Sequence, residues 1–99
     1  MVIIGMLSYA PEGAKELGKR FIAQKPLPDY ISMKGPYISG TKGEGTQTIT
    51  LYEVEKSKLP DAIEHISNRY VAYFGVPGLT YSVNVWLDAG EALKMIGLA

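Results

Sequence analysis

The order of strand-like and helix-like segments constrains the fold of this chain more than any other feature of its sequence. Four segments have the length and composition of strands, at residues 2–8, 29–38, 46–55 and 79–87. The first is a continuous apolar run, which is typical of a strand buried on both faces. The third is rich in β-branched residues, which favour a pleated sheet. We therefore expect four strands.

Two amphipathic segments separate these strands. One begins near Pro11, which suits the first turn of a helix, and it ends before Pro26, because a helix interior excludes proline. The other begins at Ser57 or Leu59 and keeps apolar residues at helical spacing as far as Phe74. Each of these segments predicts one helix.

The remaining segments complete the order. Residues 39–45 (SGTKGEG) contain three glycines and predict a hairpin connection. Asp88 and Glu91 stand at the spacing of a capping box and predict a short last helix at residues 89–96. The order β-α-β-β-α-β plus this helix is the ferredoxin-like pattern. We predict an α+β fold in one domain, residues 1–99, with an antiparallel four-stranded sheet of order 4-1-3-2 and two helices on one face.

The composition excludes several classes of site. Ten basic residues balance ten acidic ones, whereas nucleic-acid-binding proteins usually carry a basic excess, so we expect no nucleic-acid partner. The chain has no cysteine, which excludes disulfides, zinc–thiolate sites and iron–sulfur clusters. Its single histidine excludes a multi-histidine metal site within one chain. We expect no metal and no cofactor.

The sequence also predicts where the protein is found. Apolar residues 1–7 have no basic region before them and no small-residue cleavage site after them, unlike a signal peptide. No stretch approaches the roughly 20 apolar residues of a membrane span. We expect a cytoplasmic protein that has no membrane partner.

Side-chain alternation divides each predicted strand between the two faces of the sheet. We expect the more apolar sets, such as Ile49 and Leu51, to face the helices. The other sets mix hydroxyls, an amide, a lysine and large aromatic rings, and we expect them on the helix-free face. They are the candidate ligand-binding residues: Tyr30, Ser32, Lys34, Thr48, Thr50, Tyr52, Ser82, Asn84 and Trp86.

The helix-free face predicts a dimer. The first strand is central in the predicted order and carries aliphatic side chains on both sides, so one aliphatic set lies on this face. An exposed apolar patch of this kind usually marks an interface. A second copy of the chain covers it most simply, through a two-fold contact. Two sheets packed in this way enclose a space that can hold a small ligand.

At this point the chain resembles the dimeric α+β-barrel superfamily. The stretches GTQTITLYEVEKSKLPDAIEHI and TYSVNVWLDAGEAL are similar to the second halves of its small uncharacterised bacterial members. The resemblance implies two ferredoxin-like subunits packed sheet to sheet around a cavity. The superfamily includes cofactor-free monooxygenases, muconolactone isomerase-like enzymes, haem-binding members and regulatory domains, so the resemblance defines the fold more narrowly than the function.

The candidate chemistry is sparse, and it leaves open whether the chain is an enzyme. In a cavity between the sheets, Lys34 would stabilise a developing oxyanion and Asn84 would bind a carbonyl, with Tyr52 and Trp86 orienting the substrate. His65 lies off the apolar stripe of its helix, so we expect it exposed and far from that cavity. No set of nucleophile, base and orienting residue is visible.

Three functions remain open from the sequence. The first is a homodimer that binds a small organic molecule between its sheets, with cofactor-independent monooxygenase-like or isomerase-like chemistry if it is an enzyme. The second is a non-catalytic dimerisation or regulatory module. The third is an RNA-binding sheet that stacks bases on Tyr30, Tyr52 and Trp86, but the segment TITLYEV does not match the RNA-recognition pattern.

Overall fold

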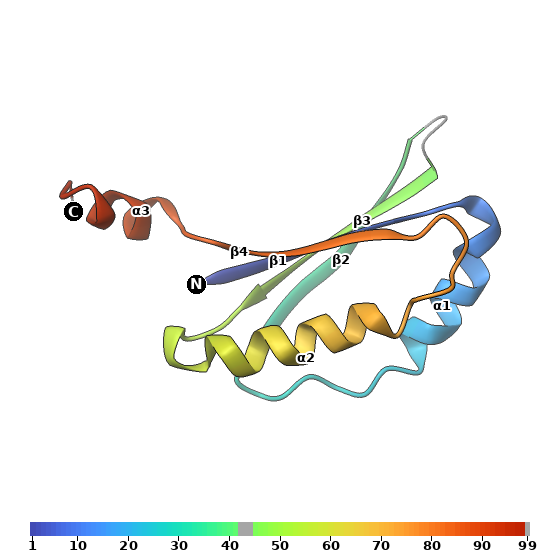
Figure 1. Cartoon of the computed structure of the whole chain (residues 1–99), viewed down its shortest axis with the longest axis horizontal. Coiled ribbons are helices and arrows are strands. Elements are labelled where there is room, and N and C mark those ends of the chain that lie inside the picture. The colour runs from blue at the N-terminus through green and yellow to red at the C-terminus, as the bar shows by residue number, and fades with distance from the viewer. Residues whose placement is uncertain (42–44, 99) are drawn as a thin grey trace.

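The computed structural model describes residues 1–41 and 45–98, and it confirms the predicted α+β fold (Figure 1). Its elements follow the β-α-β-β-α-β order, with two short 3-10 turns and a last helix. In chain order they are β1 (Val2–Tyr9), η1 (Pro11–Gly13), α1 (Ala14–Ile22), β2 (Ser32–Thr41), β3 (Gly45–Glu53), η2 (Lys56–Lys58), α2 (Leu59–Val71), β4 (Thr80–Trp86) and α3 (Ala89–Met95).

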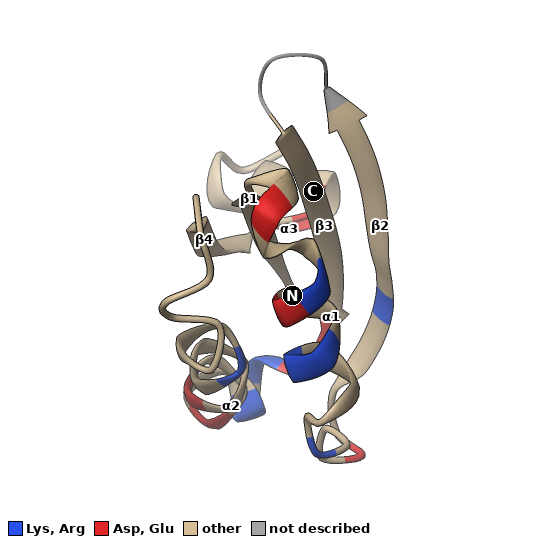
Figure 2. Cartoon of the chain, turned by 90° about the vertical axis from the view of Figure 1, so that its right-hand side faces the viewer, with Lys and Arg blue, Asp and Glu red and all other residues tan. Residues whose placement is uncertain are grey.

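The four strands form one antiparallel sheet in the order β2-β3-β1-β4, as predicted. The helices α1 and α2 lie on one side of this sheet, and no helix formed by the described residues covers the other side (Figure 1). We call these sides the helix face and the open face. The strands β1 and β4 carry no charged residue, whereas charged residues gather on the helices and connecting segments (Figure 2).

The second strand differs from its prediction at both ends. It begins at Ser32 because the preceding residues form a turn, which is closed by the Ile31 N–H donating to the Pro28 carbonyl at 3.1 Å. It continues to Thr41, which pairs with Gly45, so part of the predicted glycine-rich connection belongs to the ladder. The tip of that connection, residues 42–44, lies outside the described residues.

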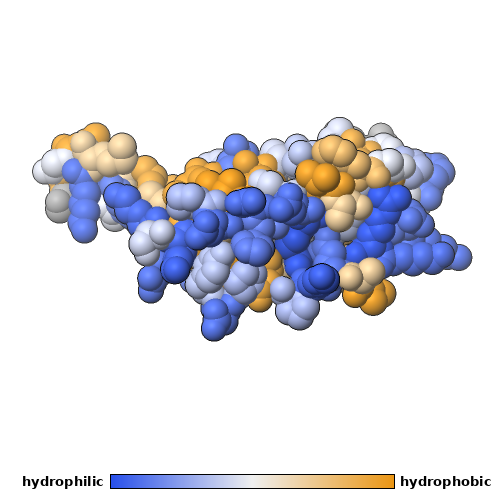
Figure 3. Space-filling model, turned by 60° about the horizontal axis from the view of Figure 1, so that its bottom comes forward, coloured by the Kyte–Doolittle hydropathy of each residue, from blue (hydrophilic) through white to orange (hydrophobic). Residues whose placement is uncertain are grey.

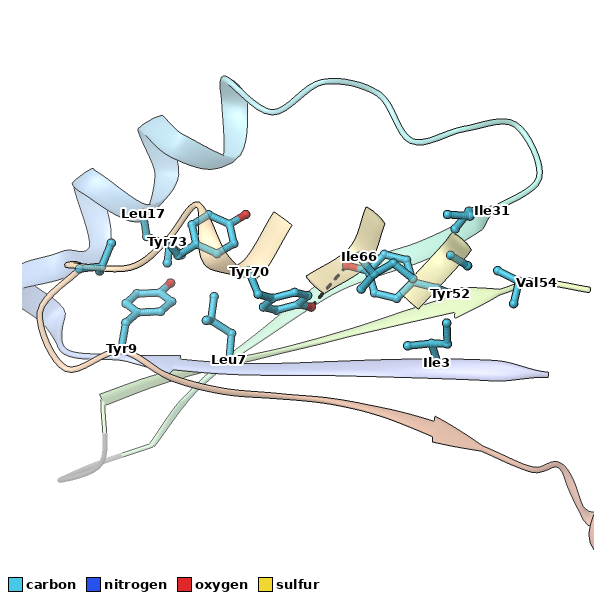
Figure 4. Close-up of a cluster of buried hydrophobic side chains, with 12 residues drawn as sticks. Ile3, Leu7, Tyr9, Leu17, Ile31, Tyr52, Val54, Ile66, Tyr70 and Tyr73 are labelled. Carbon is cyan, nitrogen blue, oxygen red and sulfur yellow. Dashed lines mark hydrogen bonds between the residues drawn. The ribbon is translucent and has the colours of Figure 1, made fainter. Parts of the chain in front are cut away.

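The core lies between the helix face and α2. Ala62, Ile66 and Tyr70 recur on one side of α2 and are buried against the sheet. From below, β1 contributes Ile3 and Leu7, whose side chains point toward the helices (Figure 4). Complete burial of Ile3 and Ile66 makes this contact the main apolar layer of the fold.

The last helix extends away from this core. Asp88 and Glu91 form the predicted capping box at its N-terminus. Figure 1 shows α3 beyond the end of the sheet, at the opposite end of the molecule from α1. None of the described helices has the length and apolar character that crossing a membrane requires.

Candidate functional site

The face predicted for three residues of β3 is wrong. Thr48, Thr50 and Tyr52 lie on the helix face and are buried, rather than on the open face. The Tyr52 hydroxyl lies 3.3 Å from the hydroxyl of Tyr70 on α2, and the two share a hydrogen bond (Figure 4). These three residues therefore cannot line a space between two sheets.

The register of the sheet explains the reversal. Residues that pair across neighbouring antiparallel strands share a face, and Thr50 pairs with Gly5 of β1. Gly5 lies directly beneath the ring of Tyr70, where an added Cβ would overlap the Tyr70 hydroxyl. The helix face thus has small residues at this point because a large aromatic side chain descends from α2 and fills the space. Ile49 and Leu51, which alternate with these residues, are left on the open face.

Tyr30 is also misplaced in the prediction. It precedes β2 and packs on the helix side of the molecule, where its ring stands edge-on to His65 of α2 with centroids 6.4 Å apart. The ammonium group of Lys58 lies 5.6 Å from the same ring. His65 is exposed, as predicted. Of the three aromatic residues expected to form a stacking platform, only Trp86 lies on the open face, so the RNA-binding arrangement is not formed.

The other five candidates lie on the open face, where we expected them. They are Ser32, Lys34, Ser82, Asn84 and Trp86, and the pairing of β2 with β3 and of β4 with β1 places them there. The Lys34 ammonium group lies 3.5 Å from a carboxylate oxygen of Glu53, in an exposed ion pair. The role of these five residues in binding a ligand stays a prediction.

An aliphatic stripe runs along the middle of the open face. The stripe comes from alternate residues of the two central strands, β1 and β3. On β4 it is flanked by Trp86, which is 49% exposed. Tyr37, which the sequence reading did not single out, flanks it on β2. The stripe comprises Val2, Ile4, Met6, Ile49 and Leu51.

The structure contains a cavity that the sequence reading missed, and it lies on the helix face. It has a volume of about 150 Å³ and lies between α1, the last turns of α2 and the strands β1, β2 and β3. Gly18 of α1 lines it, and a Cβ added at Gly18 would meet no atom within 4 Å. The missing side chain in the middle of an amphipathic helix was the one sequence signal for this space.

The lining of the cavity is mostly apolar, but it includes residues that carry hydroxyl or amide groups. These residues are Tyr9, Gln24, Thr48, Thr50, Tyr52, Tyr70 and Tyr73. Gln24 donates from Nε2 to the Arg69 carbonyl at 2.8 Å. Its Oε1 is buried and accepts no hydrogen bond from any residue that the structure describes.

Two tyrosines of the cavity, Tyr70 and Tyr73, have a raised pKa. Burial raises the pKa of the Tyr70 phenol far above its ordinary value, and the neighbouring Tyr52 raises it further. Burial also raises the pKa of Tyr73. These phenols therefore serve as hydrogen-bond donors at neutral pH and not as bases.

Charged catalytic groups are scarce around this space. Among the described residues that line it there is no carboxylate and no imidazole, and Arg69 is the one charged side chain. Across the described part of the chain, no three of the potential metal-ligating residues come together. The cavity offers shape, apolar contact and neutral donors, which suit an uncharged ligand.

Comparison with known proteins adds no assignment. No protein-family model matches the chain, and no curated protein matches its sequence.

Proposed function

We propose that this chain is a homodimeric protein of the dimeric α+β-barrel type that binds a small, uncharged organic molecule in the helix-face cavity of each subunit. The observation that carries the proposal is the cavity itself, with apolar walls and several hydroxyl groups. A volume of about 150 Å³ suits a molecule near the size of one aromatic ring. The buried phenols would donate hydrogen bonds to a carbonyl or other acceptor oxygen of that molecule.

Any chemistry at this site would follow from the same donors. Phenols that stay protonated stabilise negative charge that develops on a substrate oxygen. This supports cofactor-independent isomerase-like chemistry, or monooxygenase-like chemistry in which dioxygen is the oxidant and the substrate itself is the reductant. A base would have to come from the substrate or from solvent. We therefore propose that the site binds a small molecule, with catalysis as a secondary proposal for the same site.

The open face supports the homodimer. Its aliphatic stripe and Trp86 would be covered by the same surface of a second copy related by two-fold symmetry. The space between two such sheets, beside Lys34, Ser82 and Asn84, is a second place where a ligand could sit. A non-catalytic dimerisation or regulatory module is the alternative function, and the same aliphatic stripe favours it.

The test uses two probes of similar size, acetophenone and ethylbenzene. Both have one aromatic ring, but only acetophenone has a carbonyl that can accept a hydrogen bond. We expect both to bind, with acetophenone tighter by about 2-fold to 12-fold, the value of one hydrogen bond. Amide chemical shifts measured by NMR during titration should change at Thr50 and Tyr70, which line the cavity.

Gly18→Leu provides the decisive variant because a Cβ at this position meets no atom within 4 Å, and the rest of the leucine side chain would occupy the cavity that Gly18 lines. It should abolish binding of both probes, whereas Lys19→Leu, on the exposed side of the same helix, should leave binding unchanged. Binding that survives Gly18→Leu, or shifts confined to Ser82, Asn84 and Trp86, would place the ligand elsewhere. Failure of both probes to bind at millimolar concentration would contradict the proposal.

A further inference from the structure

The segment that follows β4, residues 87–98, projects from the rest of the molecule, and we call it the arm. Figure 1 shows it beyond the end of the sheet, and Figure 3 shows apolar and polar side chains together on its surface. The radius of gyration is 15.1 Å, compared with about 13 Å for a compact chain of this length. The molecule measures 48 × 30 × 18 Å, so it is elongated.

The helix of the arm is closed at both ends by local hydrogen bonds. At its start, a carboxylate oxygen of Asp88 accepts from the Glu91 N–H at 2.7 Å, and Glu91 accepts from the Asp88 N–H at 3.1 Å. At its end, Gly97 has φ +76° and the N–H groups of Gly97 and Leu98 donate to carbonyls of the last turn. This is a Schellman arrangement. The sequence thus defines both boundaries of a helix of only seven residues.

A helix of this length is marginal in water without a surface to pack against. None of the seven residues of α3 is buried. Ile96 and Leu98 are 69% and 70% exposed, and Met95 is 75% exposed. Although Met95 falls on the same side of the helix as Glu91, helical spacing puts the other apolar residues on the opposite side, away from Glu91 and Lys94. That side comprises Ala89, Ala92, Leu93 and Ile96.

We propose that the arm packs against a second copy of this chain, so that the two copies exchange arms across their shared interface. The inference rests on the homodimer of the proposed function. Trp86 lies on the open face, paired with Val2, and the arm follows it directly along the chain. The arm therefore begins at the edge of the surface that the second copy would cover. Two-fold symmetry lets each copy supply one arm and receive the other.

The composition of the arm favours a protein surface over a membrane surface. Helices that lie on membranes are rich in lysine and arginine. Residues 87–98 contain two acidic residues and one lysine, so the arm has no basic excess. In the structure the arm packs little on its own domain, because it extends beyond the end of the sheet (Figure 1) and no residue of α3 is buried.

The test combines sedimentation equilibrium with amide hydrogen exchange on the full chain. Leu93→Ser together with Ile96→Ser should raise the dimer dissociation constant by about tenfold or more. Lys94→Ser, on the polar side of the same helix, should change the constant by no more than about twofold. In the unsubstituted dimer, the amides of the arm should be protected from exchange, and protection should fall on dilution below the dissociation constant.

The outcomes separate this inference from the proposed homodimer. If the double variant dimerises as well as the unsubstituted chain and the arm amides exchange freely in the dimer, the arm contact is overturned and the homodimer stands. A full chain that sediments as a monomer contradicts both. Arm amides that stay protected in such a monomer would place the arm on its own chain.

Discussion

On β3, the two faces of the sheet reverse the usual distribution of side chains. The helix face, which is buried, carries Thr48, Thr50 and Tyr52 from β3. The open face carries aliphatic residues from the same strand, Ile49 and Leu51. In a protein that functions as a monomer, the aliphatic set would face the helices and the hydroxyl set would face water.

This difference has a separate cause on each side. On the helix face, Gly5 leaves space for the ring of Tyr70, and Thr48 and Thr50 border the cavity. On the open face, the aliphatic stripe is what a surface needs when a second sheet is to cover it. The comparison thus supports the proposal that the helix face binds a ligand and that the open face binds a second copy.

Adjacent residues of β1 give the largest expected contrast between the faces. Ile3 is fully buried under α2, whereas Ile4 lies on the open face. Ile3→Ala should lower the free energy of unfolding by about 2–5 kcal/mol at any protein concentration. Ile4→Ala should weaken dimerisation instead, so its effect on unfolding should disappear at concentrations where the chain is a monomer.

Urea unfolding at two protein concentrations measures both variants. If the two variants lose equal free energy of unfolding in the monomer, the contrast between the two faces is contradicted, because both faces would then be packed within one chain.

Gly5→Ala tests the close approach of Tyr70 to the sheet. The added methyl group would overlap the Tyr70 hydroxyl, so the ring must move within the core. We expect a loss of about 1–3 kcal/mol in the free energy of unfolding. Gly40→Ala is the matched control, since a Cβ there meets no atom within 4 Å. A loss at Gly5 no larger than at Gly40 would show that Tyr70 does not occupy this place.

Tyr70→Phe removes one member of the buried hydroxyl pair. The Tyr52 hydroxyl then loses its partner inside the core, which should cost about 1–2 kcal/mol in thermal or urea unfolding. Tyr81→Phe, at an exposed tyrosine stacked on Tyr70, should change stability by less than about 0.5 kcal/mol. Equal effects from the two substitutions would argue against the buried pair.

The raised pKa of Tyr70 should also make the stability of the protein depend on pH in the alkaline range. The pKa of this tyrosine is raised in the folded state, so the unfolded chain loses this proton first. Stability should be unaffected below the ordinary tyrosine pKa of about 10 and should fall above it, by about 1 kcal/mol for this group at pH 11. Between pH 8 and pH 11, the free energy of unfolding should fall less steeply with pH in Tyr70→Phe than in the unsubstituted chain. An unchanged slope in that variant would mean that Tyr70 ionises in the folded protein as it does in the unfolded chain.

Sequence reasoning predicted the elements of this fold well, because they depend on local signals. Strand composition, helical spacing, the proline near the start of the first helix and the capping box at Asp88 all act within a few residues. The strand order followed from the succession of elements. These features need no knowledge of which surfaces meet.

The site could not be predicted in the same way. Alternation divides β3 into two sets of side chains, but it does not say which set faces the helices. The rule that the more apolar set is buried selected Ile49 and Leu51, and the rule fails where the other face has its own reason to be apolar. The pairing of Gly5 with Thr50 fixes the choice, and that register appears only in the folded sheet.

The most direct test of this account is sedimentation equilibrium of the full chain at micromolar concentration. The account predicts a dimer of twice the 10.8 kDa chain mass. It also predicts that Ile4→Asp, which puts a charge in the middle of the open face, gives a folded monomer. A full chain that remains monomeric at hundreds of micromolar would contradict the central claim that a second copy covers the open face.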